Sequence, residues 1–331
     1  TTAGGTTIAS GATLDLQGVI VGAEAVTING GTLVTSTGTS SLSGAISLGA
    51  SGSTVSVSGT QLTLSGVISG SNGFTKDGSG ILVLSNANTY TGTTTVSAGT
   101  LTITNATGLG TTAGGTTIAS GATLDLQGVI VGAEALTING GTLATSTGTS
   151  SLSGAISLGA GGSTFSVAGS QLTLTGVISG SNGFTKDGGG VLVLSNDNGI
   201  ANANTYTGTT TVSAGTLSLG ASDVIANGSA LTVNGGTLAL GSYNESVGTV
   251  TIGSSGGSIT GSGTLTATTS YTFNNTSSAT ISAILAGTGV TLTQAGAGTT
   301  TLSNTNTYSG NTTINTGGVL VASAAGNLGT G

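Results

Sequence analysis

Nine carboxylates are the first side chains in this sequence that could carry out chemistry. They are Asp15, Glu24, Asp77, Asp125, Glu134, Asp187, Asp197, Asp223 and Glu245. Two carboxylates in one groove can cleave a glycosidic bond, one as the acid and the other as the nucleophile or base. Asp15 and Glu24, however, recur 110 positions later as Asp125 and Glu134, as repeated surface features do. We therefore predict no catalytic residue and no enzyme, and a polysaccharide-active fragment is the least favoured function.

Several residue types needed for other chemistry are absent. The chain has no histidine, cysteine or arginine, so it has no Ser-His-Asp or Cys-His nucleophile, no zinc site of the usual kind and no pectate-lyase arginine. Two lysines and a net charge of −7 offer no surface that could neutralise phosphates, which argues against nucleic-acid binding. We predict no cofactor. For Lys76-Asp77 and Lys186-Asp187 we expect solvated loops, since adjacent residues point apart.

Three other groups of residues could bind a ligand. Asn196-Asp197-Asn198-Gly199 resembles a calcium loop, but the nonapeptide word of calcium-binding β-rolls is missing, so we expect a surface insertion and no metal. An Asn-Thr-Tyr word could expose Tyr90, Tyr206 and Tyr308 for recognition. We expect it instead to turn a corner, with the asparagine satisfying backbone groups and the tyrosine covering the edge of the coil.

Threonine arrays such as Thr93-Thr94-Thr95 raise the possibility of ice binding. That function would need pairs of outward threonines at the same register in every coil. Words such as Leu62-Thr63-Leu64 give only single outward threonines, so we do not expect it.

Internal repetition organises the chain. Residues 1–86 align without a gap with 111–196, and 87–101 match 203–217 after an insertion at 197–202; nine of these 101 positions differ. The differences keep apolar residues apolar, as in Val55 and Phe165. We therefore expect repeat units at 1–110, 111–217 and, more diverged, 218–331, forming one continuous solenoid. Neither end shows a polar capping unit, which suggests a longer array.

Apolar residues alternate with polar ones over short runs such as Leu62-Thr63-Leu64 and Leu82-Val83-Leu84. This period of two predicts strands with one buried face. Leu64 and Leu84 lie 20 residues apart, which is too far for tight hairpins and about right for one turn of a coil. We predict an all-β, right-handed parallel β-helix, a β-solenoid of roughly 15 rungs, with an antiparallel sandwich as the alternative. The apolar runs are too short for a spanning helix, so we expect no membrane insertion of this segment.

One longer motif carries a family resemblance. Gly73-Phe74-Thr75-Lys76-Asp77-Gly78 leads into a strand, followed by Asn88-Thr89-Tyr90-Thr91-Gly92 and Gly99-Thr100-Leu101. It resembles the autotransporter-associated β-strand repeat, also called the passenger-associated transport repeat. The second copy spans 183–217. The third, at 292–319, has Gln294 and Ala295 in place of Lys76 and Asp77.

The resemblance implies a right-handed β-helical passenger of a bacterial adhesin or giant surface protein, secreted to the cell surface, with folding coupled to secretion. We therefore predict a structural stalk or filament segment outside the cell. Its partners would be further repeats of the same array, end to end or in one chain, and cell-surface or matrix glycans. A glycan-binding solenoid face is the alternative function.

Overall fold

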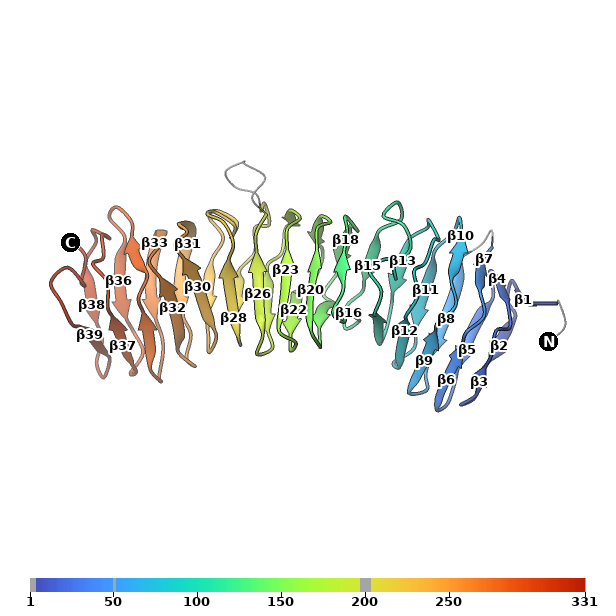
Figure 1. Cartoon of the computed structure of the whole chain (residues 1–331). Helices are drawn as coiled ribbons and strands as arrows, with labels where there is room; N and C mark the ends of the chain where they lie inside the picture. Colours follow the sequence, from blue (N-terminus) through green and yellow to red (C-terminus); the bar gives the residue numbers. More distant parts are fainter. Residues whose placement is uncertain (1–3, 50–51, 197–203, 331) are drawn as a thin grey trace. The chain divides into compact units, whose positions relative to one another are not determined.

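The computed structural model describes residues 4–49, 52–196 and 204–330. The chain forms an all-β parallel β-solenoid of about 15 turns, with no helix among the described residues. Consecutive strands pass from sheet to sheet and return to the first after about twenty residues (Figure 1). The prediction of a parallel solenoid is therefore confirmed, and the antiparallel sandwich is wrong.

Two compact units make up the chain, Thr1–Ser163 and Thr164–Gly331. Their boundary falls within β22 (Ser163–Val167), in the middle of the second sequence repeat. The two units follow from contacts within the chain, and the three sequence repeats stay a prediction. Each unit is a stack of coils with its own core.

The first unit contains four sets of hydrogen-bonded strands. One set is β1 (Thr6–Ala9), β4 (Val26–Asn29), β7 (Ile46–Leu48) and β10 (Ile68–Gly70). The second is β2 (Thr13–Asp15), β5 (Thr32–Thr35), β8 (Ser53–Val57), β11 (Phe74–Asp77), β13 (Thr94–Val96), β15 (Thr116–Ile118), β18 (Leu136–Ile138) and β21 (Ile156–Leu158). The third is β3 (Ile20–Val21), β6 (Thr39–Leu42), β9 (Gln61–Leu64), β12 (Ile81–Leu84), β14 (Thr100–Ile103), β16 (Thr123–Leu126) and β19 (Thr142–Thr145), and the fourth is β17 (Ile130–Val131) and β20 (Thr149–Leu152).

The second unit is built mainly from two sets, preceded by β24 (Ile178–Gly180). One set is β25 (Phe184–Asp187), β27 (Thr210–Val212), β29 (Leu231–Val233), β31 (Glu245–Ile252), β33 (Thr264–Phe273), β36 (Thr291–Gln294) and β38 (Thr312–Ile314), with β35 (Ile284–Ala286) beside β33. The other is β23 (Gln171–Leu174), β26 (Val191–Leu194), β28 (Thr216–Leu219), β30 (Thr237–Gly241), β32 (Gly257–Gly261), β34 (Ala279–Ile281), β37 (Thr299–Leu302) and β39 (Val319–Ala322).

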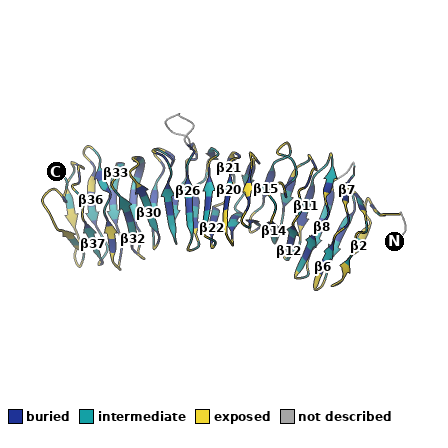
Figure 2. Ribbon diagram, viewed as in Figure 1, coloured by how far each residue is buried: buried dark blue, intermediate teal, exposed yellow. Residues whose placement is uncertain are grey.

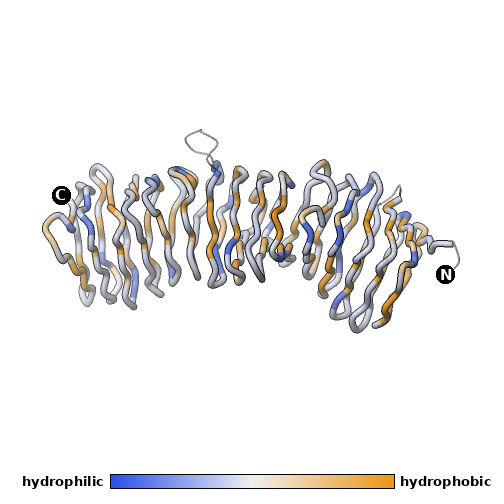
Figure 3. The backbone as a smooth tube through the Cα atoms, viewed as in Figure 1, coloured by the Kyte–Doolittle hydropathy of each residue, from blue (hydrophilic) through white to orange (hydrophobic). Residues whose placement is uncertain are grey.

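The core of each unit is a narrow stack of aliphatic side chains. Leu82 lies in register between Leu62 and Leu101, and all three are 0% exposed. Along a strand, buried and partly exposed residues alternate (Figure 2). The same alternation produces the banded hydropathy of the backbone (Figure 3). The neighbouring coils on both sides bury these leucines, because a single coil alone has nothing to cover them.

Within the first unit, two strands that are copies of the same repeated segment belong to different sheets. β4 and its copy β18 have nearly the same sequence, yet β4 pairs with β1 and β7, whereas β18 pairs with β15 and β21. The sheet of β15 and β18 is the one that contains β2 and β5. The 110-residue repeat therefore consists of a whole number of coils plus one further strand position, so the next copy begins on a different sheet. Equivalent outward residues in the two copies thus lie on different sheets.

Candidate functional site: the repeated lysine–tyrosine corner

The most distinctive polar group of the first unit is a buried lysine at a corner between strands. Lys76 lies on β11, two residues after Phe74, and is 0% exposed. Its Nζ donates hydrogen bonds to the backbone oxygens of Asp77 at 2.9 Å, Gly78 at 2.7 Å and Ala98 at 3.0 Å. Ala98 belongs to the following coil, so the ammonium group joins two coils.

The expectation of a solvated loop is therefore wrong for both lysines. Lys76 and Lys186 lie on strands with inward side chains, while Asp77 and Asp187 are exposed. The aliphatic stem of each lysine fills the core, and its three N–H donors bond to three backbone oxygens. Burial lowers the pKa of each ammonium group to about 8, although the neighbouring aspartate opposes this shift.

An asparagine side chain connects three successive coils at the same corner. Asn88 is 4% exposed; its Oδ1 accepts from the N–H of Ile68 at 2.8 Å, and its Nδ2 donates to the backbone oxygen of Gly108 at 2.7 Å. Since Ile68 and Gly108 lie in the preceding and following coils, the amide takes the place of a backbone peptide in the ladder. The expectation that this asparagine satisfies backbone groups is confirmed.

The tyrosine of the same word lies inside the core. Tyr90 is 0% exposed, its hydroxyl lies 2.7 Å from Oγ1 of Thr94, and its ring makes an edge contact with Phe74 at 5.6 Å. Burial raises the pKa of its phenol, with a smaller opposing effect from the Thr94 hydrogen bond. Tyr206 and Tyr308 are equally buried. None of the three can form an exposed recognition patch, and the ring fills the corner instead of covering the edge of the coil.

The second copy of the corner repeats this geometry. Lys186 Nζ donates to the backbone oxygens of Asp187 at 2.8 Å, Gly188 at 2.6 Å and Ala214 at 3.1 Å. Asn204 links the Ile178 N–H to the oxygen of Val224, and Tyr206 contacts Thr210 at 2.6 Å.

The third copy keeps the asparagine and the tyrosine but replaces the lysine. Gln294 is 0% exposed, and its Nε2 donates to the backbone oxygens of Gly296 at 3.0 Å and Gly298 at 3.2 Å and to Oδ1 of Asn275 at 3.2 Å. Its Oε1 is buried without a hydrogen bond among the described residues. Asn306 and Tyr308 bond as their counterparts do.

The carboxylates serve local structure. Asp15 accepts from Gln17 and Ser36, and these hydrogen bonds, that of Gln17 first, lower the pKa of its carboxyl group. Asp125 makes the equivalent contacts with Gln127 and Ser146.

Two glutamates are buried. Burial raises the pKa of Glu134, which accepts from the hydroxyl of Thr116. Burial also raises the pKa of Glu245 to about 8, and its carboxylate accepts from the backbone N–H groups of Val224 and Ile225 at 3.0 and 3.1 Å. In the part of the chain that the structure describes, no three acidic side chains gather as a metal site.

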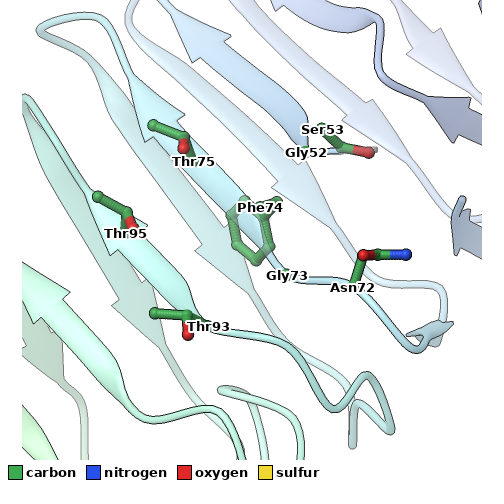
Figure 4. A pocket seen from close by; sticks show the side chains of 8 residues that line it. All are labelled: Gly52, Ser53, Asn72, Gly73, Phe74, Thr75, Thr93 and Thr95. Atoms are coloured by element: carbon green, nitrogen blue, oxygen red, sulfur yellow. The ribbon is translucent and has the colours of Figure 1, made fainter. Parts of the chain in front are cut away.

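One shallow hollow of about 200 Å³ lies on the first unit beside the lysine corner, lined by Gly52, Ser53, Asn72, Gly73, Phe74, Thr75, Thr93 and Thr95 (Figure 4). Its lining offers hydroxyls, an amide and backbone groups but no titratable side chain. Asp197 and the rest of the predicted insertion lie outside the described residues. Over residues 4–49, 52–196 and 204–330, no helix is long and apolar enough to cross a membrane.

Comparison with known proteins finds one family whose model matches the three segments that contain the corners. A family model described as the passenger-associated-transport-repeat matches residues 74–103, 184–219 and 292–322. Each match contains one lysine or glutamine corner together with its Asn-Thr-Tyr word. No curated protein and no solved structure matches the chain.

Proposed function

From the three passenger-associated-transport-repeats that this chain carries, we propose that it is a structural segment of a secreted bacterial passenger, a stalk that holds other parts of the polypeptide away from the cell. The repeats and the parallel solenoid fit a structural segment of an autotransporter passenger. Such repeats also imply a secreted, cell-surface context.

The single observation that carries the proposal is the thrice-repeated corner. In each copy, buried side chains that could bind a ligand elsewhere instead bond to backbone groups of the same and neighbouring coils. The hydrogen bonds of Asn88, Asn204 and Asn306 each run to the preceding and following coil. Polar groups used in this way resist separation of the coils, which is the property a stalk needs.

The corners also suit a chain that folds after crossing a membrane. Each asparagine needs a backbone oxygen supplied some twenty residues later, as Asn88 does from Gly108. Coils of this kind add one by one to a growing end, because each contacts only its neighbours. We propose that further repeats of the same array continue the stack, whether in one chain or end to end, and that other parts of the polypeptide contact surface glycans.

Localisation on intact cells tests the proposal. An antibody raised against the 331-residue chain should label the outside of unpermeabilised cells, and an added broad-specificity protease should remove the label. Labelling that requires permeabilised cells would contradict the proposal. A display test sharpens it: replacing Asn88, Asn204 and Asn306 together with alanine should reduce the amount of folded passenger at the surface, whereas alanine at exposed Thr7, Thr205 and Thr280 should not.

A further inference from the structure

The outer face of the long sheet of the second unit carries an unbroken column of threonines. Seven strands of that sheet, from β25 to β38, each place one threonine at the same register position. The column consists of Thr185, Thr211, Thr232, Thr251, Thr272, Thr293 and Thr313. Each side chain lies on the outer side of its strand, because the next residue of every strand but the last is buried.

In the third repeat this column becomes two columns wide. Thr249 pairs in register with Ser270, and Ser270 with Thr291, two positions before the main column on the same three strands. Pairs of outward hydroxyls, which the sequence did not predict, are therefore present in three successive coils but not in every coil. They lie on β31, β33 and β36, and the middle pair is Ser270 with Thr272. Neighbouring strands lie about 4.8 Å apart and alternate residues about 6.7 Å apart, so the hydroxyls form a regular grid.

The hydroxyls of this grid are available for an external partner. Those of Thr251, Thr272 and Thr293 make no hydrogen bond within the described residues. Ladders of identical side chains also stabilise flat sheets, which are otherwise unusual. The grid therefore presents methyl groups and free hydroxyls together on a regular surface.

The surroundings of the grid restrict what it can bind. No charged residue occurs after Glu245 in the sequence, and Glu245 itself is buried. Ionic ligands such as phosphates or acidic glycans thus find no counter-charge here. The aromatic residues after Glu245, namely Tyr271, Phe273 and Tyr308, are 0% exposed, so none of their rings is available to stack on a sugar; Tyr243, before the start of β31, is 37% exposed.

From these observations we propose that the threonine grid of β31, β33 and β36 binds the surface of ice. Ice presents neutral oxygen atoms on a flat, repeating lattice. A neutral, repeating array of hydroxyl and methyl groups without aromatic rings is complementary to such a lattice. Many weak contacts made at once would give the binding its strength, as in other multivalent interactions. The column of β11 and β13 in the first unit, where Thr75 and Thr95 lie in register and project together, has the same chemistry in a single row (Figure 4).

Partition into growing ice tests the proposal with the 331-residue chain. When ice grows slowly on a cold surface, solutes without affinity are excluded, and we expect this chain to be enriched in the ice. Replacing Thr251 and Thr272 with lysine places two charges in the main column and should remove the enrichment. The matched control replaces Thr280 and Thr301 with lysine; these threonines are also register neighbours, but on β34 and β37 of the other sheet.

Circular dichroism of both variants verifies that the strands remain folded. Exclusion of the unaltered chain from ice would overturn the proposal, and so would equal loss of enrichment in the two lysine variants. Enrichment of the unaltered chain and of the control alone would support it. The same proteins are incubated with crystalline cellulose and chitin, and binding there without partition into ice would identify the grid as a glycan surface instead.

Discussion

The two lysine corners and the glutamine corner solve one packing problem with different chemistry. In each case a strand turns beside several backbone oxygens that face the core. Lys76 and Lys186 bring three donors each and leave none of the three oxygens without a partner, but they place a charge in the core. Gln294 brings a neutral amide with two N–H groups and leaves its own Oε1 without a hydrogen bond. The corner therefore requires donors, and charge is one of two ways of supplying them.

Charge is also distributed unevenly around the three corners. Glu134 and Glu245 raise the pKa of Tyr90 and Tyr206 respectively, in both cases as a lesser cause than burial. The third corner lies in the stretch of sequence that has no charged residue. We therefore expect the lysine corners to respond to pH between 8 and 10.5, where the lysines titrate, and Gln294, which does not titrate, to give no such response.

Removing the donors should produce the largest effect. In Lys76→Met the stem still fills the core, but three oxygens lose their hydrogen bonds, and loss of the buried charge offsets only part of this. We expect the free energy of unfolding to fall by about 2–4 kcal/mol, measured as a shift of the urea midpoint. Lys76→Gln, which imitates the third corner, should lose less than half as much. Equal losses in the two variants would mean that the charge, and not the donors, holds the corner.

Titration of the two lysines should give the next largest effect. Their pKa is about 8 in the folded chain and 10.5 when unfolded, so between these values the unfolded chain binds more protons. Stability should therefore rise as pH increases from 8 to 10.5, on the order of 3 kcal/mol per lysine. Thermal unfolding at several pH values measures this. The rise should disappear in a Lys76→Gln, Lys186→Gln double variant, and its persistence there would contradict the assignment.

Glu245 should act in the opposite direction at lower pH. Its pKa is about 8 in the folded chain against 4.5 unfolded, so the folded chain binds more protons between these values. Stability should fall as pH rises from 4.5 to 8, by more than it rises for one lysine, because the pKa shift of Glu245 is larger. Together with the lysines this predicts a stability minimum near pH 8. Glu245→Gln should make the acidic limb less steep without changing the basic limb; the slope that remains comes from Glu134, whose pKa is also raised. Asp15→Asn, at an exposed carboxylate, should leave the acidic limb unchanged.

Much of the fold was predictable from the sequence. The spacing of 19 to 20 residues between words such as Leu62-Thr63-Leu64 and Leu82-Val83-Leu84 matches the observed register of β9 and β12. The change of sheet between β4 and β18 was not predictable, because their words are nearly identical. Which sheet a strand joins depends on how many strand positions lie between the two copies. The segments around Asn88 and Leu109 each occupy such a position although they are not strands, and their sequences have no apolar alternation that would reveal it.

The corner was only half predictable. The asparagine was assigned correctly because its short amide commonly replaces a peptide group. The lysines were assigned to solvent because charged side chains are seldom fully buried. The period-two pattern, however, contained the contrary signal: Lys76 lies two residues after Phe74 and so shares its inward face. The backbone oxygens that make burial tolerable come from turns such as Gly78, with a φ of 78°, and no sequence pattern specifies their position.

Removing the tyrosine hydroxyls should have the smallest effect on stability, and the loss should be the same at the first lysine corner as at the glutamine corner. In Tyr90→Phe and Tyr308→Phe, the ring and its packing remain, while one hydroxyl contact to a threonine is lost. Tyr206→Phe loses the contact to Thr210 and also the interactions of the hydroxyl with the backbone of Ala226 and the side chain of Ser229. Tyr90→Phe and Tyr308→Phe should each reduce the free energy of unfolding by about 1 kcal/mol, although a lysine occupies the first corner and a glutamine the third, because both hydroxyls bond to a threonine and not to the backbone oxygens around Lys76 or Gln294. Tyr206→Phe should cost more, because its hydroxyl has further partners. Tyr243→Phe, at a partly exposed ring, should have no effect. A loss at Tyr90 much larger than at Tyr308 would contradict this expectation. It would show that Lys76 and the Tyr90 hydroxyl stabilise each other, and that Gln294 does not replace the lysine in this respect.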